Sequence, residues 1–124
     1  MDCIFCKIIN GEIPCKKLYE DDLVIAILDV NPRSCGHTLV IPKKHYKDIT
    51  ELPDELLLHI NKVSLKLADK IAEKLDTKSI TFVINYLDNL VPHFHKHIIP
   101  GYNFEPNKDM KYTVDETFDI LKEE

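Results

Sequence analysis

Residues 92–100 have the sequence Pro92-His93-Phe94-His95-Lys96-His97-Ile98-Ile99-Pro100, in which three histidines occupy alternate positions of an apolar run. Side chains of a β-strand alternate between its faces, so in a strand His93, His95 and His97 would share one face, with neighbours roughly 6–7 Å apart. Imidazole can act as a nucleophile, transfer a proton or bind a metal near neutral pH. A sheet gains nothing from this row that valine or threonine would not supply, so the row is a candidate reaction centre.

The rest of the chain predicts an α+β fold. Five β-rich runs are expected to form strands, at residues 16–20, 23–29, 37–42, 79–86 and 93–99. Between the third and fourth runs, residues 53–75 carry apolar side chains at three- and four-residue steps, which predicts one amphipathic helix on the order of 35 Å long. Short helices are expected at residues 3–10 and, from the capping-box spacing of Thr113 and Glu116, near the C-terminus. This order indicates a five-stranded antiparallel sheet with the long helix on one face.

The composition is that of a globular protein. Of the 124 residues, 44% are hydrophobic and 30% are charged, which suits a single domain over residues 1–124, with a core at 1–101 and a C-terminal tail at 102–124. The formal net charge of -5 gives no reason to expect a nucleic-acid partner. No apolar stretch approaches the roughly 20 residues that span a bilayer, and the start lacks the features of a signal peptide. We therefore expect a cytoplasmic protein with no membrane partner.

The cysteines offer a possible metal site. In a reducing compartment they are not expected to form disulfides: Cys3, Cys6, Cys15 and Cys35. The C-x-x-C spacing of Cys3 and Cys6 suits a metal site better than a redox pair, because thioredoxin-like pairs follow a strand. A closed zinc site needs two further ligands, and the histidines are the obvious source. His37 and His45 flank the third predicted strand, so His37 could join the histidine row while His45 joins the cysteines.

The order of these motifs resembles the histidine triad (HIT) family. The matching stretches are residues 4–9 with 12–14, residues 26–30, residues 36–43 and the histidine row at 93–99. They cover the first hundred residues in the order found in the family. The resemblance implies an enzyme that acts on nucleotides, and a homodimer in which two five-stranded sheets join into one ten-stranded layer.

The resemblance also implies roles for individual residues. His95 would attack the α-phosphorus of a nucleoside 5′-phosphate derivative and form a covalent nucleotidyl-histidine that water hydrolyses. His97 would hydrogen-bond the phosphate oxygens or the leaving atom, and its protonated form would offset negative charge there. His37 or a backbone carbonyl would hold the other nitrogen of a catalytic imidazole and fix its tautomer. Asp29 would accept hydrogen bonds from the ribose hydroxyls, and Asn85 would help to hold the nucleotide. Apolar side chains would contact or surround the base: Phe5, Ile8, Ile13, Ile27 and Val30. Core packing explains any one of these five about equally well.

Family members with an amino-terminal C-x-x-C bind zinc, and the ligands here would be Cys3, Cys6, His45 and His93. Such a closed site leaves no open coordination position, so the zinc would be structural. The loop before the histidine row departs from the family pattern, because the stretch at residues 85–92 is shorter than in the family and contains no glycine. The tail after Gly101 also differs, so the leaving group is left open.

These features predict a hydrolase of purine nucleoside 5′-phosphoramidates or related α-phosphate derivatives of nucleotides. A dinucleoside polyphosphate hydrolase is the nearest alternative. Another is a metal-dependent hydrolase in which His93, His95 and His97 bind a catalytic ion that activates water. A nucleotide-binding regulatory protein with little turnover is the third alternative.

Overall fold

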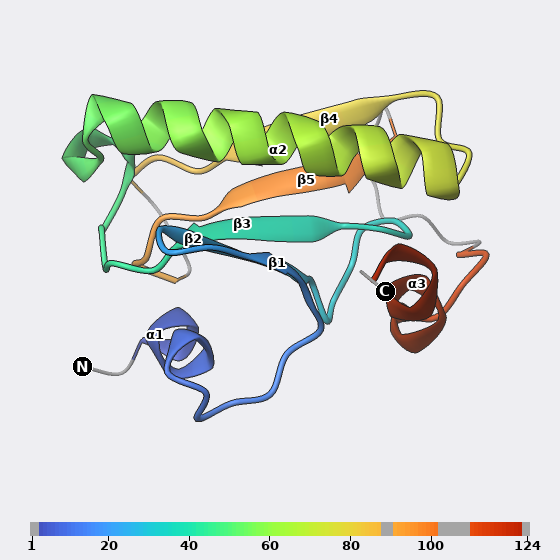
Figure 1. Ribbon diagram of the computed structural model, residues 1–124, viewed down its shortest axis with the longest axis horizontal. Coiled ribbons are helices and arrows are strands. Elements are labelled where there is room, and N and C mark those ends of the chain that lie inside the picture. The colour runs from blue at the N-terminus through green and yellow to red at the C-terminus, as the bar shows by residue number, and fades with distance from the viewer. Residues whose placement is uncertain (1–2, 88–90, 102–109, 123–124) are drawn as a thin grey trace.

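A computed structural model describes residues 3–87, 91–101 and 110–122, and its elements are shown in Figure 1. Asn89, in the loop that departs from the family pattern, and tail residues 102–109 lie outside the described residues. The strands are β1 (Lys17–Glu20), β2 (Val24–Leu28), β3 (Thr38–Pro42), β4 (Ile80–Ile84) and β5 (Lys96–Pro100). They form one five-stranded antiparallel sheet, as the sequence predicted, and the strand order is β1-β2-β3-β5-β4.

Helices lie on both faces of this sheet. The long helix α2 (Asp54–Lys74) covers one face, the short helix α1 (Ile4–Ile9) lies under the other, and α3 (Val114–Leu121) stands at one end (Figure 1). The apolar stripe predicted for α2 is buried. The capping box of Thr113 and Glu116 begins α3, also as predicted. None of the helices among the described residues has the length and apolar character needed to cross a bilayer.

The central strands β2 and β3 are buried along their whole length, which explains their continuous apolar sequence. Alternate side chains of β2 and β3 enter two separate cores. The core on the α2 side contains Val24, Ala26 and Leu28 of β2. The core on the α1 side contains Ile25 and Ile27, together with Phe5 of α1. The α1 side of the sheet is also where the predicted metal and catalytic residues gather.

The last strand starts later than predicted. β5 begins at Lys96, so His93 and His95 precede the sheet ladder. The main-chain N–H of His93 donates to the carbonyl of Val91 at 2.8 Å, and that of Phe94 donates to the carbonyl of Tyr46 at 2.6 Å. These local and long-range bonds replace strand pairing at residues 93–95, and the prediction of a regular strand from His93 was wrong.

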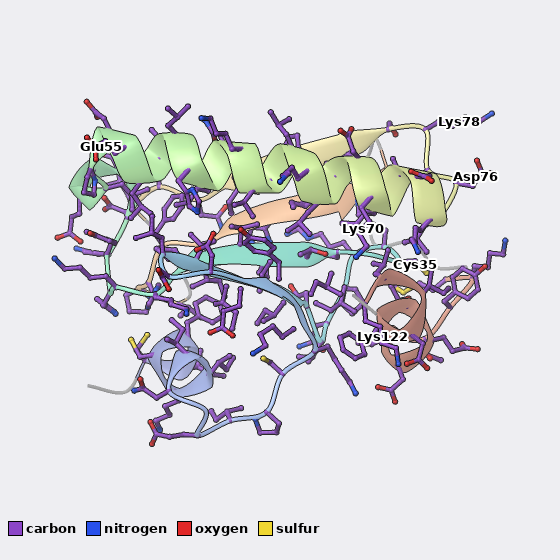
Figure 2. All side chains as sticks on the ribbon, viewed as in Figure 1. Cys35, Glu55, Lys70, Asp76, Lys78 and Lys122 are labelled. Atoms are coloured by element: carbon purple, nitrogen blue, oxygen red, sulfur yellow. The ribbon has the colours of Figure 1, made fainter. Side chains whose placement is uncertain are left out.

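The loop between β2 and β3 leads directly to His37, one of the predicted catalytic residues. Gly36 has φ +92°, and a Cβ built there would lie 2.7 Å from Cδ1 of Leu75, so this position requires glycine. The neighbouring Cys35 lies beside α3 (Figure 2), where its thiol donates to the carbonyl of Tyr112 and accepts from its N–H, both at 3.4 Å. The loop that delivers His37 is therefore held by α2 and by the segment before α3.

The turn between β1 and β2 is held by one carboxylate. Asp21 accepts hydrogen bonds from the Tyr19 hydroxyl at 2.7 Å and from the main-chain N–H groups of Leu23 and Val24 at 2.8 and 2.9 Å. Its Oδ2 also lies 2.7 Å from Nε2 of His59 on α2. Burial alone would raise the pKa of Asp21, but these donors outweigh it and hold the pKa well below its ordinary value. The ionised carboxylate joins the hairpin to the helix layer.

Replacing Asp21 with alanine should lower the free energy of unfolding by about 2 kcal/mol at pH 7, because several donors lose a charged acceptor. The lowered pKa means that this stabilisation is complete above the unfolded-state pKa, near 3.9, and declines as the pH falls below it. Urea unfolding of both proteins should therefore show a difference that narrows below about pH 4. The exposed neighbour Asp22, changed to alanine, is the control. An equal loss in both variants would contradict this account.

Candidate active site and metal cluster

Two cysteines and two histidines meet beneath the sheet. Sγ of Cys3 lies 3.2 Å from Nδ1 of His93, and Sγ of Cys6 lies 3.3 Å from Nδ1 of His45 and 3.4 Å from Nδ1 of His93. All four ligand atoms lie within 4.8 Å of one another. Cys3 and Cys6 bracket the first turn of α1, His45 follows β3, and His93 precedes β5. The structure thus brings together the four residues predicted to hold a metal.

This donor set fits a structural zinc ion, which favours sulfur and imidazole ligands in a closed tetrahedron. Nε2 of the fully buried His93 lies 2.9 Å from the carbonyl of Pro42, which can only accept, so Nε2 carries the hydrogen. Nδ1 of His93 therefore presents its lone pair to the thiols, as a second-shell carbonyl arranges for metal-bound histidines. Burial and the hydrogen bond with Cys3 raise the pKa of the Cys6 thiol to about 11, so metal binding must displace a proton there.

His95 has a defined tautomer. Its Nδ1 lies 2.8 Å from the carbonyl oxygen of His93, so Nδ1–H donates and Nε2 carries the lone pair. Burial lowers the pKa of His95 below its ordinary value, although the His93 carbonyl and Asp29 act in the opposite direction. The ring makes edge contacts with Phe5 and His97, both at 4.9 Å between centroids. A neutral, oriented imidazole with a free nitrogen can act as a nucleophile.

His37 and His97 form a second ordered pair. The main-chain N–H of Arg33 donates to Nδ1 of His37 at 3.0 Å, so the hydrogen of neutral His37 is on Nε2. That Nε2–H donates to Nδ1 of His97 at 2.9 Å, and His97 in turn keeps its hydrogen on Nε2. Burial, with His95 and His37 nearby, lowers the pKa of His97 to about 4. In the free protein His97 is therefore a neutral hydrogen-bond donor, and a protonated His97 would require a bound anion to raise its pKa.

A second group of possible metal ligands contains Asp29, His37 and His97, whose ligand atoms also lie within 4.8 Å. The tautomers oppose this use, because the Arg33 amide places the hydrogen of His37 on the nitrogen that would bind the ion. Within the described residues, His93, His95 and His97 do not appear together as a group with ligand atoms this close. The observed geometry therefore does not support the alternative of a catalytic ion bound by the histidine row.

The residues predicted to hold a nucleotide differ in their surroundings. Asp29 follows β2 directly, with Oδ2 3.6 Å from Nε2 of His37, and its Oδ1 accepts from the N–H of Asn31. Phe5 and Ile27 are only 7% and 4% exposed and pack in the α1-side core, whereas Val30 is 72% exposed. Ile8 and Ile13 are half-buried, and Asn85 is exposed beyond β4, without a hydrogen bond to the described histidines. Asp29 and Phe5 thus reach the histidines, while Ile8, Ile13 and Val30 retain surface for a ligand.

Sequence reasoning did not identify the Arg33 amide and the Pro42 carbonyl as the groups that fix the tautomers of His37 and His93, and it gave Phe5 a base-contact role without its ring contacts to His93 and His95. The first two are main-chain groups, and no side-chain pattern identifies them. The place of Phe5 near the metal cluster could have been inferred from the sequence, because Phe5 lies between Cys3 and Cys6 and its position depends on theirs.

Comparisons with known proteins agree with this arrangement. A model of the HIT domain matches residues 10–104. The chain is 50% identical over 103 residues to an uncharacterized HIT-like protein of Methanocaldococcus jannaschii, covering 81% of this chain and 79% of that one. It is 43% identical over 108 residues to an adenosine 5′-monophosphoramidase of Schizosaccharomyces pombe, covering 85% and 78%. A crystal structure of a zinc-bound histidine triad family protein from Mycobacterium smegmatis aligns with a TM-score of 0.87 at 32% identity, over 98% of this chain and 91% of that one.

Proposed function

Because this chain belongs to the histidine triad (HIT) family, we propose that it hydrolyses purine nucleoside 5′-phosphoramidates or related nucleotide α-phosphate derivatives through a covalent intermediate on His95. The observation that carries the proposal is the hydrogen bond from Nδ1 of His95 to the His93 carbonyl, which leaves a neutral Nε2 lone pair available. The name of the fission-yeast relative, an adenosine 5′-monophosphoramidase, supports this substrate class.

The reaction proceeds in two displacements. Nε2 of His95 forms a bond to the α-phosphorus while the phosphorus–nitrogen bond to the amine breaks, and the departing amine takes a proton from solvent. Water then cleaves the histidine–phosphorus bond, which releases the nucleoside monophosphate, returns a proton to solvent and restores neutral His95. A covalent intermediate divides one difficult step into two easier ones.

The remaining polar groups orient the phosphate. His97 offers Nε2–H to a phosphate oxygen or to the leaving atom, and His37 holds His97 in that tautomer through the 2.9 Å bond. Asp29 binds the ribose hydroxyls beside them, and Asn85 approaches the nucleotide from the end of β4. We assign the base contacts to Ile8, Ile13 and Val30, with Phe5 and Ile27 forming the buried floor.

The proposed metal is one zinc ion, held by Cys3, Cys6, His45 and His93. When bound, it supplies a structural crosslink between α1, the segment after β3 and the segment before β5. The same set of thiols suits a reducing compartment, which supports a cytoplasmic location.

We also propose a homodimer formed along β4. This strand is at the edge of the sheet, and the strand and the residues after it expose apolar side chains: Phe82, Ile84, Tyr86 and Leu87. Leu58 and Leu65 of α2 are exposed as well. An unpaired edge strand with apolar neighbours is a natural pairing surface, and pairing β4 with its copy would give a ten-stranded layer.

The purified protein should release AMP from adenosine 5′-phosphoramidate with a kcat/KM at least about 10-fold above that for diadenosine tetraphosphate. We expect this preference because the fission-yeast relative is named as an adenosine 5′-monophosphoramidase. Release of AMP from each substrate, followed by chromatography, measures the ratio. A reversed ratio would favour the polyphosphate hydrolase, and tight nucleotide binding without product would favour the regulatory protein.

A further inference from the structure

Phe5 occupies an unusual place between the metal cluster and the candidate nucleophile. It lies in the first turn of α1, where Cys3 is the N-cap residue and its Sγ accepts from the N–H of Cys6 at 3.3 Å. The Phe5 ring is 7% exposed and packs beneath the sheet. The two cysteines on either side of Phe5 therefore determine where its ring lies.

The Phe5 ring contacts two of the histidines edge-on. Its centroid lies 4.9 Å from that of His95 at an interplanar angle of 69°, and 5.9 Å from that of His93 at 87°. His97 makes a similar contact with His95, at 4.9 Å and 66°. Such tilted geometries are the favourable ones for aromatic pairs. The hydrogen bond of His95 to the His93 carbonyl holds only one ring atom, so the edge contacts with Phe5 and His97 add restraint against rotation of the ring.

We propose that Phe5 is a positioning residue, which holds the His95 ring so that Nε2 faces the phosphorus, and that the Cys3/Cys6 metal cluster acts on the nucleophile through it. This inference rests on the proposed function of His95. It differs from the base-contact role implied by the family resemblance, because the ring has little surface left for a base. Misplacing a reacting atom by even about 1 Å is enough to slow a reaction strongly.

The test compares Phe5→Leu with Ile9→Ala. Ile9 is on the same helix and packs against the same core, but it has no ring to make the edge contact with His95, so its truncation serves as the control. With adenosine 5′-phosphoramidate, Phe5→Leu should lower kcat about 10-fold, with KM within about 2-fold and metal content unchanged. Ile9→Ala should leave kcat within about 2-fold. A rise in KM at constant kcat would overturn the proposal in favour of base contact, and so would equal losses of kcat in both variants.

A second measurement does not depend on turnover. In protein labelled with ¹⁵N-histidine, the Nδ1–H of His95 should give a resonance protected from exchange with water, identified by its absence in His95→Ala. Phe5→Leu should broaden or remove that resonance while Ile9→Ala retains it, both with full metal content. An unchanged resonance in Phe5→Leu, or a loss that follows the loss of metal, would overturn the proposal. If the parent protein does not cleave the phosphoramidate, the proposed function fails, and this comparison still decides the role of Phe5.

Discussion

Replacing His95 with alanine should lower the kcat/KM for adenosine 5′-phosphoramidate by roughly 10³-fold or more. The variant loses the Nε2 lone pair to which the proposed mechanism assigns the attack on phosphorus, and none of the other histidines in the cluster offers a replacement. Nδ1 of His97 is occupied by His37, and both ring nitrogens of His93 are engaged in the metal cluster and with Pro42. Two measurements check this. The first is the rate of AMP release, and the second is the intact protein mass after acid quench, which should show an adenylylated species in the parent protein and none in His95→Ala.

The matched control is Lys96→Met, at the adjacent position of the chain. The Lys96 side chain turns away from the histidines, since its Nζ donates to Oδ1 of Asn61 on α2 at 3.0 Å. This variant should keep turnover within about 3-fold of the parent protein. Full activity in His95→Ala with metal content intact would show that another group attacks phosphorus, and the two-displacement scheme would have to be abandoned.

The parts of the fold that follow from local pattern could be predicted from the sequence. The continuous apolar runs of β2 and β3 reflect burial on both faces, and the spacing from Leu56 to Ile71 reflects the single buried stripe of α2. The C-x-x-C pair and the histidine row were sufficient to indicate a metal site and a reaction centre, because few structural roles require those side chains together, but the role of each histidine came from the family resemblance.

Long-range main-chain contacts could not be predicted. The late start of β5 depends on the bond from Phe94 to the carbonyl of Tyr46, 48 positions earlier in the chain (94 minus 46). The tautomers of His37 and His93 depend on the main-chain N–H of Arg33 and the main-chain carbonyl of Pro42. Such main-chain groups are present along the whole chain, so the sequence does not mark these two. These contacts decide which imidazole nitrogen is free, which no spacing of side chains can show.

The apolar residues near the predicted nucleotide site expose another limit of sequence analysis. Phe5, Ile27 and Val30 have similar hydrophobicity, yet Val30 is 72% exposed while the other two are nearly buried. Core packing and base binding both favour such side chains, so only the three-dimensional surroundings distinguish them.

Replacing Cys3 with serine should reduce bound zinc from one equivalent to near zero and lower the free energy of unfolding by about 3–5 kcal/mol. Serine keeps the approximate size, and its hydroxyl oxygen can accept the N-cap hydrogen bond in place of the sulfur, but the hydroxyl does not ionise near neutral pH and cannot replace a thiolate ligand. The loss is large because the proposed ion joins α1 to the segment after β3 and to the segment before β5. Elemental analysis of the purified protein and urea unfolding measure the two effects.

Cys15→Ser provides the comparison for this change. Cys15 is half-buried and packs beside the α1-side core, outside the metal cluster, so its variant should keep one zinc and lose less than about 1 kcal/mol. Retention of zinc in Cys3→Ser would mean that the cluster is not the binding site, while loss of zinc in both variants would point to a general disturbance of α1. If Cys3→Ser alone loses zinc, its residual turnover becomes informative, because His93 then keeps its bond to Pro42 without the metal. A large fall in kcat of the zinc-free variant would show that the hydrogen bond between His93 and the Pro42 carbonyl is not enough, and that the ion is needed to maintain the position of the nucleophile.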